Sequence, residues 1–161
     1  MRLAFAILAD AAVFTPDGKL QVQGGDLDTV YSTVFPAVQP TMSLAVKLNA
    51  DSGDISQGFI LRLEATTPQD APWFPAFAVP FTANPNPLTG GQPVKVAFVL
   101  NLPMLVFPIA GTYKIRLSVK RDQPGERFRL LIELPVYAML MPASEATAET
   151  GLQAPTGEAV R

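Results

Sequence analysis

The sequence predicts an all-β fold, namely an antiparallel β-sandwich of the immunoglobulin-like or C2-like type. Two observations support this prediction. Apolar and polar residues alternate along most of the chain, as they do in extended strands, whose side chains repeat every two residues. Turn-forming sequences rich in proline, glycine and aspartate separate these stretches at short intervals. About eight or nine short strands with this spacing are typical of a sandwich.

The individual strands follow from the alternation and from the turns between them. The predicted strands cover residues 3–9, 20–24, 27–31, 42–48, 59–66, 94–100, 113–120 and 128–136. The turns between them include Pro16-Asp17-Gly18, Asp51-Ser52-Gly53-Asp54, Pro85-Asn86-Pro87, Ala110-Gly111 and Gln123-Pro124-Gly125. Together these elements predict one sandwich domain over residues 1–138. Residues 139–161 lose the alternation, so we expect an irregular C-terminal tail.

Composition excludes several classes of enzyme. The chain has no cysteine and no histidine among its 161 residues. Disulfides, thiolate chemistry and catalysis by serine–histidine or cysteine–histidine pairs are therefore excluded within this chain. The commonest ligand of zinc is also missing. Neither Gly24-Gly25 nor Gly90-Gly91 is followed by the lysine or helix of a nucleotide site. We expect a protein that is not an enzyme and uses no cofactor.

Charge and hydropathy limit the partners and the location. The net charge is −2, so no overall field attracts the chain to nucleic acid. No apolar run approaches the ~20 residues that span a bilayer. The run Leu3–Ala9 ends at Asp10, where a signal peptide would carry a small residue, and this favours a first strand. We expect a cytoplasmic protein without membrane insertion and without a nucleic-acid partner.

Four aspartates in two predicted turns are the candidates for a metal site. They are Asp26, Asp28, Asp51 and Asp54. If the fold brought these turns together, their oxygens could bind calcium, which takes six to eight such ligands. Neither turn has the spacing of an EF-hand, however, and an aspartate in a turn usually bonds its own backbone. We therefore expect no metal site, and calcium or glycan binding by these acidic loops remains an alternative.

Basic residues concentrate in one predicted hairpin and are the candidates for anion binding. They are Lys114, Arg116, Lys120, Arg127 and Arg129. Alternation places them on the face opposite Ile115, Leu117 and Val119, with Phe128 and Leu130 turned inward. Such a row could bind an anionic surface or a phosphate. A solvated outer face that protects an edge strand from aggregation predicts the same pattern.

Residues 72–81 form a segment that is apolar on both faces. Its predicted core row contains Trp73, Phe77, Val79 and Phe81. Phe74, Ala76 and Ala78 then point outward, with nothing polar among them. Pro75 and Pro80 remove ladder donors, which favours a sheet edge. The segment is either a loop folded over the end of the sandwich or a contact with another subunit.

The interface candidates combine this segment with the apolar start of the tail, since methionine packs adaptably. They are Trp73, Phe74, Ala76, Ala78, Met139 and Met141.

Several short motifs resemble those of a known family. The motifs are Leu8-Ala9-Asp10-Ala11, Asp17-Gly18-Lys19-Leu20, Gly24, Phe35-Pro36 and Ala110-Gly111-Thr112-Tyr113. They resemble a bacterial family of small single-domain β-sandwich proteins of unknown function, with Leu27 in place of that family's aromatic residue. The resemblance covers residues 3–136 and implies one β-sandwich without established catalytic residues.

These observations together predict a non-enzymatic interaction module. We expect it to act through contacts with another protein or with a second copy of itself. The partner is not identified by the sequence.

Overall fold

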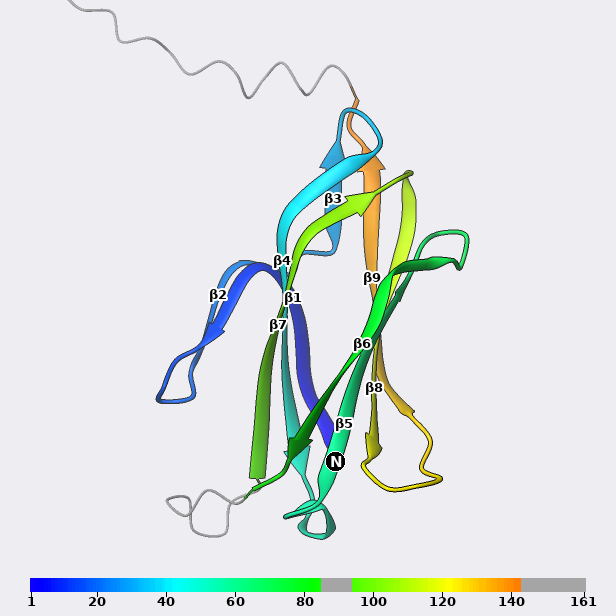
Figure 1. Ribbon diagram of the computed structural model, residues 1–161. Helices are drawn as coiled ribbons and strands as arrows, with labels where there is room; N and C mark the ends of the chain where they lie inside the picture. The colour runs from blue at the N-terminus through cyan, green and yellow to red at the C-terminus, as the bar shows by residue number, and fades with distance from the viewer. Residues whose placement is uncertain (85–93, 143–161) are drawn as a thin grey trace, which may run out of the picture.

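The computed structural model describes residues 1–84 and 94–142, and these residues form nine β-strands and one 3-10 turn (Figure 1). The elements are β1 (Arg2–Phe14), β2 (Leu20–Gly25), β3 (Thr29–Ser32), β4 (Ala37–Ala50), η1 (Ser52–Asp54), β5 (Gly58–Thr66), β6 (Pro72–Thr82), β7 (Val94–Phe107), β8 (Gly111–Arg121) and β9 (Arg129–Leu140). The predicted all-β fold is therefore confirmed.

Two sheets pack face to face as a β-sandwich (Figure 1). One sheet has the strand order β2-β1-β4-β7 and the other the order β3-β9-β8-β5-β6. Neighbouring strands are antiparallel except β3 and β9, which run parallel. The expectation of a purely antiparallel sandwich is wrong at this edge, because the chain crosses between the sheets after β2 and enters the second sheet beside β9.

Several strands extend beyond their predicted ends. β4 begins at Ala37 and β7 continues to Phe107. These two residues pair with each other, and β7 forms the edge of the first sheet. Residues 72–82 form a true strand, β6, so the interpretation of this segment as a loop folded over the end of the sandwich is wrong. The strand lies at the edge of the second sheet, the position that its prolines indicated. β9 continues to Leu140, past the predicted domain boundary at residue 138. The tail from residue 143 and the predicted turn at 85–91 lie outside the described residues.

The core lies between the sheets and contains the alternating rows that the sequence predicted. In β5 the inward residues are Phe59, Leu61, Leu63 and Ala65, and each is at most 3% exposed. β8 contributes Tyr113, Ile115, Leu117 and Val119, which are likewise at most 3% exposed. Because inward side chains alternate with outward ones, the residues between them are left on the outer face of the second sheet.

Aromatic rings close one end of the core. Trp73 in β6 lies with its ring centroid 4.6 Å from the rings of both Phe107 and Tyr113. Its Nε1–H also donates to the carbonyl oxygen of Val106 at 2.7 Å. Since Val106 belongs to the other sheet, Trp73 joins the edge of one sheet to the edge of its partner.

Candidate functional site

The outer face of β5, β8 and β9 carries charges that neutralise one another. Cross-strand register places Arg116 between Glu64 and Glu133. The Nε–H of Arg116 donates to Oε2 of Glu133 at 2.6 Å, and this bond raises the pKa of Arg116. Arg62 forms an ion pair with Glu64. Arg116 of the predicted basic row is therefore neutralised by a neighbouring carboxylate, and an exposed pair such as Arg116–Glu133 contributes little stability.

A β-bulge divides the predicted row of basic side chains. Leu117 pairs with Ile132 but the next residue, Ser118, pairs with Leu130, so Leu131 is an extra residue in β9. An extra residue in a strand moves every side chain that precedes it to the opposite face of the sheet. Arg129 consequently pairs with the buried Val119 and lies at the end of the core instead of on the outer face. The outward orientation predicted for Arg129 is wrong for this reason.

The same bulge turns aromatic and aliphatic side chains outward. Leu130, predicted to be inward, is 52% exposed. Phe128 faces Arg62 and Lys120, whose charged groups lie 4.8 Å and 5.4 Å from the ring centre. At these distances the cations interact with the face of the ring. Phe128 therefore belongs to the outer face, and the expectation that it faces the core is wrong.

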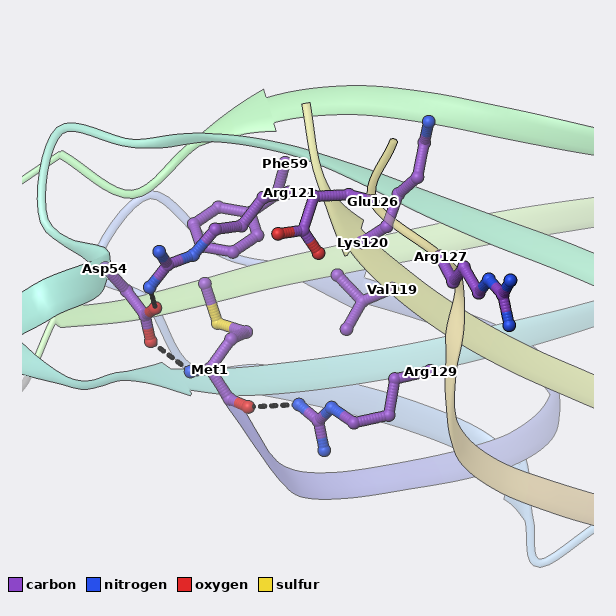
Figure 2. A pocket seen from close by; sticks show the side chains of 9 residues that line it. All are labelled: Met1, Asp54, Phe59, Val119, Lys120, Arg121, Glu126, Arg127 and Arg129. Atoms are coloured by element: carbon purple, nitrogen blue, oxygen red, sulfur yellow. Dashed lines mark hydrogen bonds and ion pairs between the residues drawn. The ribbon is translucent and has the colours of Figure 1, made fainter. Parts of the chain in front are cut away.

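A cavity of about 380 Å³ opens at one end of the sandwich. Figure 1 shows the N-terminus at this end, and Figure 2 shows the side chains that line the cavity. We call it the basal cavity. It is lined by Met1, Asp54, Phe59, Val119, Lys120, Arg121, Glu126, Arg127 and Arg129. The lining comes from Met1, which directly precedes β1, and from η1, β5, β8, the β8–β9 loop and β9, so distant parts of the sequence meet here.

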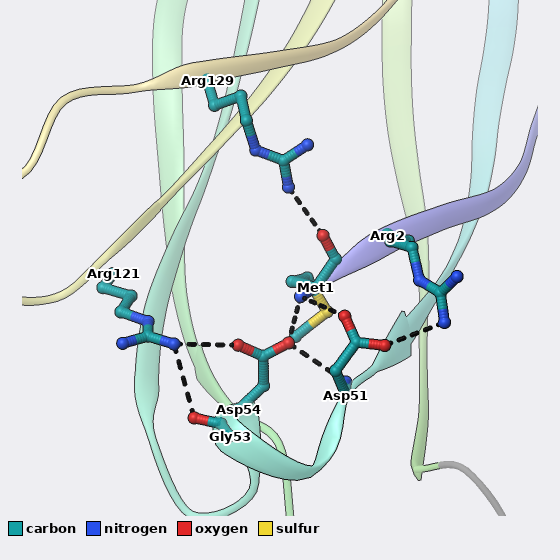
Figure 3. Close-up of polar contacts among 7 residues, drawn as sticks. All are labelled: Met1, Arg2, Asp51, Gly53, Asp54, Arg121 and Arg129. Carbon is teal, nitrogen blue, oxygen red and sulfur yellow. Dashed lines mark hydrogen bonds and ion pairs between the residues drawn. The ribbon is translucent and has the colours of Figure 1, made fainter.

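One side of the basal cavity is a buried polar network (Figure 3). The ammonium group of Met1 forms an ion pair with Asp54, whose side chain is only 7% exposed. Arg121 Nη2 lies 3.3 Å from Oδ1 of the same carboxylate, and the N–H of Asp51 donates to its Oδ2 at 3.1 Å. On the other side of Met1, Arg129 Nη2 donates to the Met1 carbonyl oxygen at 2.6 Å.

This network keeps Asp54 ionised. Burial raises the pKa of Asp54, but the hydrogen bonds and charge of the Met1 ammonium, with hydrogen bonds from the Asp51 N–H and from Arg121, outweigh it and lower the pKa below its usual value. Asp51 also has a lowered pKa, chiefly because the Met1 ammonium and Arg2 bind its carboxylate. Both carboxylates therefore face cations of the protein itself.

The other two candidate aspartates lie elsewhere in the fold. Asp28 accepts a hydrogen bond from Tyr137 N–H through its carbonyl oxygen, and its carboxylate accepts one from Thr29. Asp26 has a left-handed backbone with φ of 64° and lines a separate cavity with Asp28. Within residues 1–84 and 94–142 no three metal-ligating side chains come together. The structure thus leaves the four aspartates in two separate places.

The interface candidates are also divided between two places. β6 and β9 are separated by β5 and β8 in their sheet, so residues 73–78 do not meet Met139 and Met141. Trp73 and Phe74 are partly buried and pack against the core. The outward orientation predicted for Phe74 is wrong, because register shifts beside Ala65 change the alternation there. Ala76 and Ala78 are exposed, as predicted.

An exposed apolar surface lies at the opposite edge of the same sheet. In the parallel pair, Tyr31 of β3 lies opposite Met139 of β9, and Tyr137 lies two residues before Met139 on the same face. Their exposed fractions are 61%, 49% and 40%. We call these three residues the β3–β9 surface. Leu140, at the end of β9, is also 61% exposed.

Comparison with known protein families shows which family this chain belongs to. A family of unknown function, DUF6941, matches residues 4–133. The chain belongs to this family. The resemblance seen in the sequence motifs is thereby confirmed, and the DUF6941 match covers nearly all of both sheets.

Comparisons of this DUF6941 member with individual proteins add little. No curated protein sequence matches it. Among solved structures, the C-terminal domain of Wzt is similar with a TM-score of 0.44 and 9% sequence identity, over 86% of this chain and 72% of that one. In the described part of the chain, none of the secondary structure is a helix long and apolar enough to cross a membrane.

Sequence reasoning missed two features of this DUF6941 member. The β3–β9 surface includes Tyr31 and Tyr137, which no local pattern singled out because a parallel pairing joins residues far apart in the sequence. The bulge did leave a signal: Leu130-Leu131-Ile132 are three consecutive apolar residues in a strand that otherwise alternates. Such a break in period is where an extra residue is expected.

Proposed function

We propose that this DUF6941 member is a non-enzymatic interaction module that binds a second copy of itself through the β3–β9 surface. The observation that carries this proposal is the exposure of Tyr31, Tyr137 and Met139, which adjoin one another on a single face. Aromatic residues and methionine are enriched in protein interfaces. A group of large apolar side chains left in water is typical of an interaction site.

The two edges of the second sheet differ in a way that supports this choice. The edge strand β6 contains Pro72, Pro75 and Pro80, and proline cannot donate to a new strand. The other edge strand, β3, contains neither proline nor a charged residue over Thr29–Ser32. Proline and charge are two of the usual protections of an edge, and β3 has neither of them.

The chemistry of the surface favours a second copy over a charged partner. The β3–β9 surface carries no charge, so two copies related by a twofold axis can face each other without like-charge repulsion. Tyrosine is suited to such a contact, since its ring loses water while its hydroxyl can stay hydrated at the rim. A self-complementary apolar surface of this kind is expected in a symmetric dimer.

The mass of the full chain in solution tests the proposal. Sedimentation equilibrium should show a dimer at concentrations of about 100 μM, and Tyr31→Ser should weaken dimerisation by about tenfold, the scale of an interface aromatic. Val13→Ser is the matched control, because Val13 is 52% exposed in β1, outside the β3–β9 surface. A monomeric wild-type chain, or equal weakening by Val13→Ser, would overturn the proposal.

Phe74 is a poor position for such a test, although its sequence context suggests it. Its ring packs against the core and lies 5.6 Å from Trp73 and 6.5 Å from Phe77. Substitution by aspartate would therefore place a charge in a partly buried apolar cluster and reduce folding stability. A change in mass after Phe74→Asp would not distinguish dissociation from unfolding.

Two further statements form part of the proposal. The sandwich is of the immunoglobulin-like or C2-like type, as the number and spacing of its strands indicate. The module is also proposed to act in the cytoplasm. Fractionation of cells that express the full chain from its own promoter checks the location, and recovery mainly outside the cytoplasm contradicts it.

A further inference from the structure

We infer that the side of the sandwich between β1 and β9 binds an extended segment of a partner protein, a strand with alternating apolar side chains and a lysine or arginine at its end. The segment pairs with the edge of β1, in the way that peptides add a strand to an existing sheet. The inference rests on this side of the sandwich and is independent of the β3–β9 surface.

Neighbouring strands cover only part of β1 and of β9 on this side. β2 pairs with residues 9–14 of β1, and β3 pairs with residues 137–140 of β9. Figure 1 shows β3 beside only the upper part of β9. In the part of the chain that the structure describes, residues 2–8 and 129–136 therefore have a paired strand on one side only.

A cavity of about 240 Å³ lies along these two uncovered edges, and we call it the lateral cavity. Its lining consists of short runs of consecutive residues, namely Ala6, Ile7 and Leu8 of β1, Leu134 and Pro135 of β9, and Asp26, Leu27 and Asp28 of the β2–β3 connection. Successive side chains of a strand point to opposite faces. Consecutive residues of a strand therefore line one cavity along the edge of the strand, where an added strand would lie.

The backbone of β1 has unused hydrogen-bonding groups at this edge. The carbonyl oxygen of Leu8 accepts a hydrogen bond from the N–H of Leu27 at 3.0 Å, so Leu8 directs its backbone groups away from β4. This direction alternates along an antiparallel pair, and the register with β4 is regular over residues 5–8. The N–H and C=O of Ala6 therefore also point away from β4, where no described strand pairs with them.

Of the two edges, β1 is the one able to accept a strand. Residues 3–7 contain neither proline nor charge. β9 has Pro135, which lacks an N–H donor, and the bulge at Leu131, and both features protect an edge from pairing.

The lateral cavity also has room for an apolar side chain of the added strand. On the opposite side of the sandwich, aromatic rings close the space between the sheets, with Phe81 and Phe98 at 5.0 Å between centroids. In the lateral cavity the inward residue of β1 is Ala6, whose methyl group leaves the space open. A partner's apolar side chain placed there would leave water and contact Leu27 and Leu134.

Charge determines what lies next to that apolar side chain. Asp26 and Asp28 are exposed and are the only charged residues in the lining. Within residues 1–84 and 94–142, neither of them forms an ion pair. Complementary charge selects partners, so these two carboxylates favour a lysine or arginine at the end of the segment.

Amide NMR spectra of the full chain, titrated with a synthetic heptapeptide, test the inference. The peptide alternates threonine and valine, has a lysine at each end, and is blocked at both termini. We expect saturable shifts at residues 5–8 and 26–28, with a dissociation constant below about 1 mM. The same peptide with glutamate in place of both lysines should bind at least about tenfold more weakly, because its charges face Asp26 and Asp28.

Two variants locate the binding. Ala6→Leu fills the lateral cavity and should weaken peptide binding at least about tenfold. Ala78→Leu, at an exposed position of β6, is the matched control and should leave the affinity unchanged. Asp26→Asn combined with Asp28→Asn should weaken binding of the lysine peptide by about tenfold. Asparagine tolerates the left-handed backbone of residue 26, so this double variant tests the same site even if Ala6→Leu does not fold.

Four results would overturn the inference. The first is the absence of saturable shifts at millimolar peptide. The second is a set of shifts confined to β3, β6 or β7, because the peptide would then pair with a different edge. The third is unchanged affinity in Ala6→Leu or in the double aspartate variant. The fourth is a shift of residues 5–8 with protein concentration alone, which would place a second copy of the chain at this edge.

Discussion

Substitution of Trp73 by leucine should destabilise the sandwich strongly, because this side chain connects the edges of both sheets. Leucine removes the 2.7 Å hydrogen bond from Nε1 to the Val106 carbonyl oxygen. It also removes the ring contacts with Phe107 and Tyr113, each at 4.6 Å between centroids. Such a hydrogen bond contributes about 1 kcal/mol net, and each aromatic pair about 0.5–1.5 kcal/mol beyond its buried area.

These terms predict that Trp73→Leu lowers the free energy of unfolding by about 2–4 kcal/mol. Trp73→Phe keeps an aromatic ring and loses the donor, so its cost should be about 1 kcal/mol. With a urea m value of about 2 kcal/mol/M, the leucine variant should unfold at a midpoint lower by about 1–2 M.

Urea unfolding followed by far-ultraviolet circular dichroism measures the difference, since Trp73 is the only tryptophan and its fluorescence is lost with it. Phe128→Leu provides the matched control. Phe128 lies on the outer face against Arg62 and Lys120, so the same kind of truncation should cost less than about 1 kcal/mol there. Equal losses for Trp73→Leu and Phe128→Leu would refute the reasoning.

Three further outcomes follow from the structure. The pKa of Asp54 is lowered in the folded chain, so its contribution to stability is present above the ordinary pKa of 3.8 and is lost as the pH falls below that value. Melting temperatures measured from pH 7 to pH 2 should therefore fall less steeply at acid pH for Asp54→Asn than for the wild-type chain. Gly24→Ala should lower the free energy of unfolding by about 1–3 kcal/mol, because φ is +57° and the added Cβ would lie 2.0 Å from an Asp10 carboxylate oxygen. The double variant with Asp10→Ala should recover part of the loss in urea midpoint. If it recovers nothing, backbone strain alone is responsible. Arg116→Gln should change the free energy of unfolding by less than about 1 kcal/mol, because its ion pair with Glu133 is exposed; a larger drop in urea midpoint would contradict a solvated outer face.

Local pattern determined much of this fold. The inward rows of β5 and β8 can be read directly from the alternation of Phe59 to Ala65 and of Tyr113 to Val119, because burial of one face imposes a period of two. The prolines of β6 identified an edge strand for an equally local reason, the missing N–H donor. The absence of cysteine and histidine excludes the same catalytic classes in any fold.

Tertiary structure alone decided where the candidate sites lie. A single extra residue, Leu131, reversed the facing of the side chains before it, so the predicted outer row lost Arg127 and Arg129 to the basal cavity. Arg129 and Met1 are 128 positions apart and meet only because both sheets end at the same place. Tyr31 and Met139 meet through a parallel pairing at the edge of the second sheet. The alternation of a strand determines two faces, but the partner strands and their register determine which face reaches the core, the cavity or the solvent.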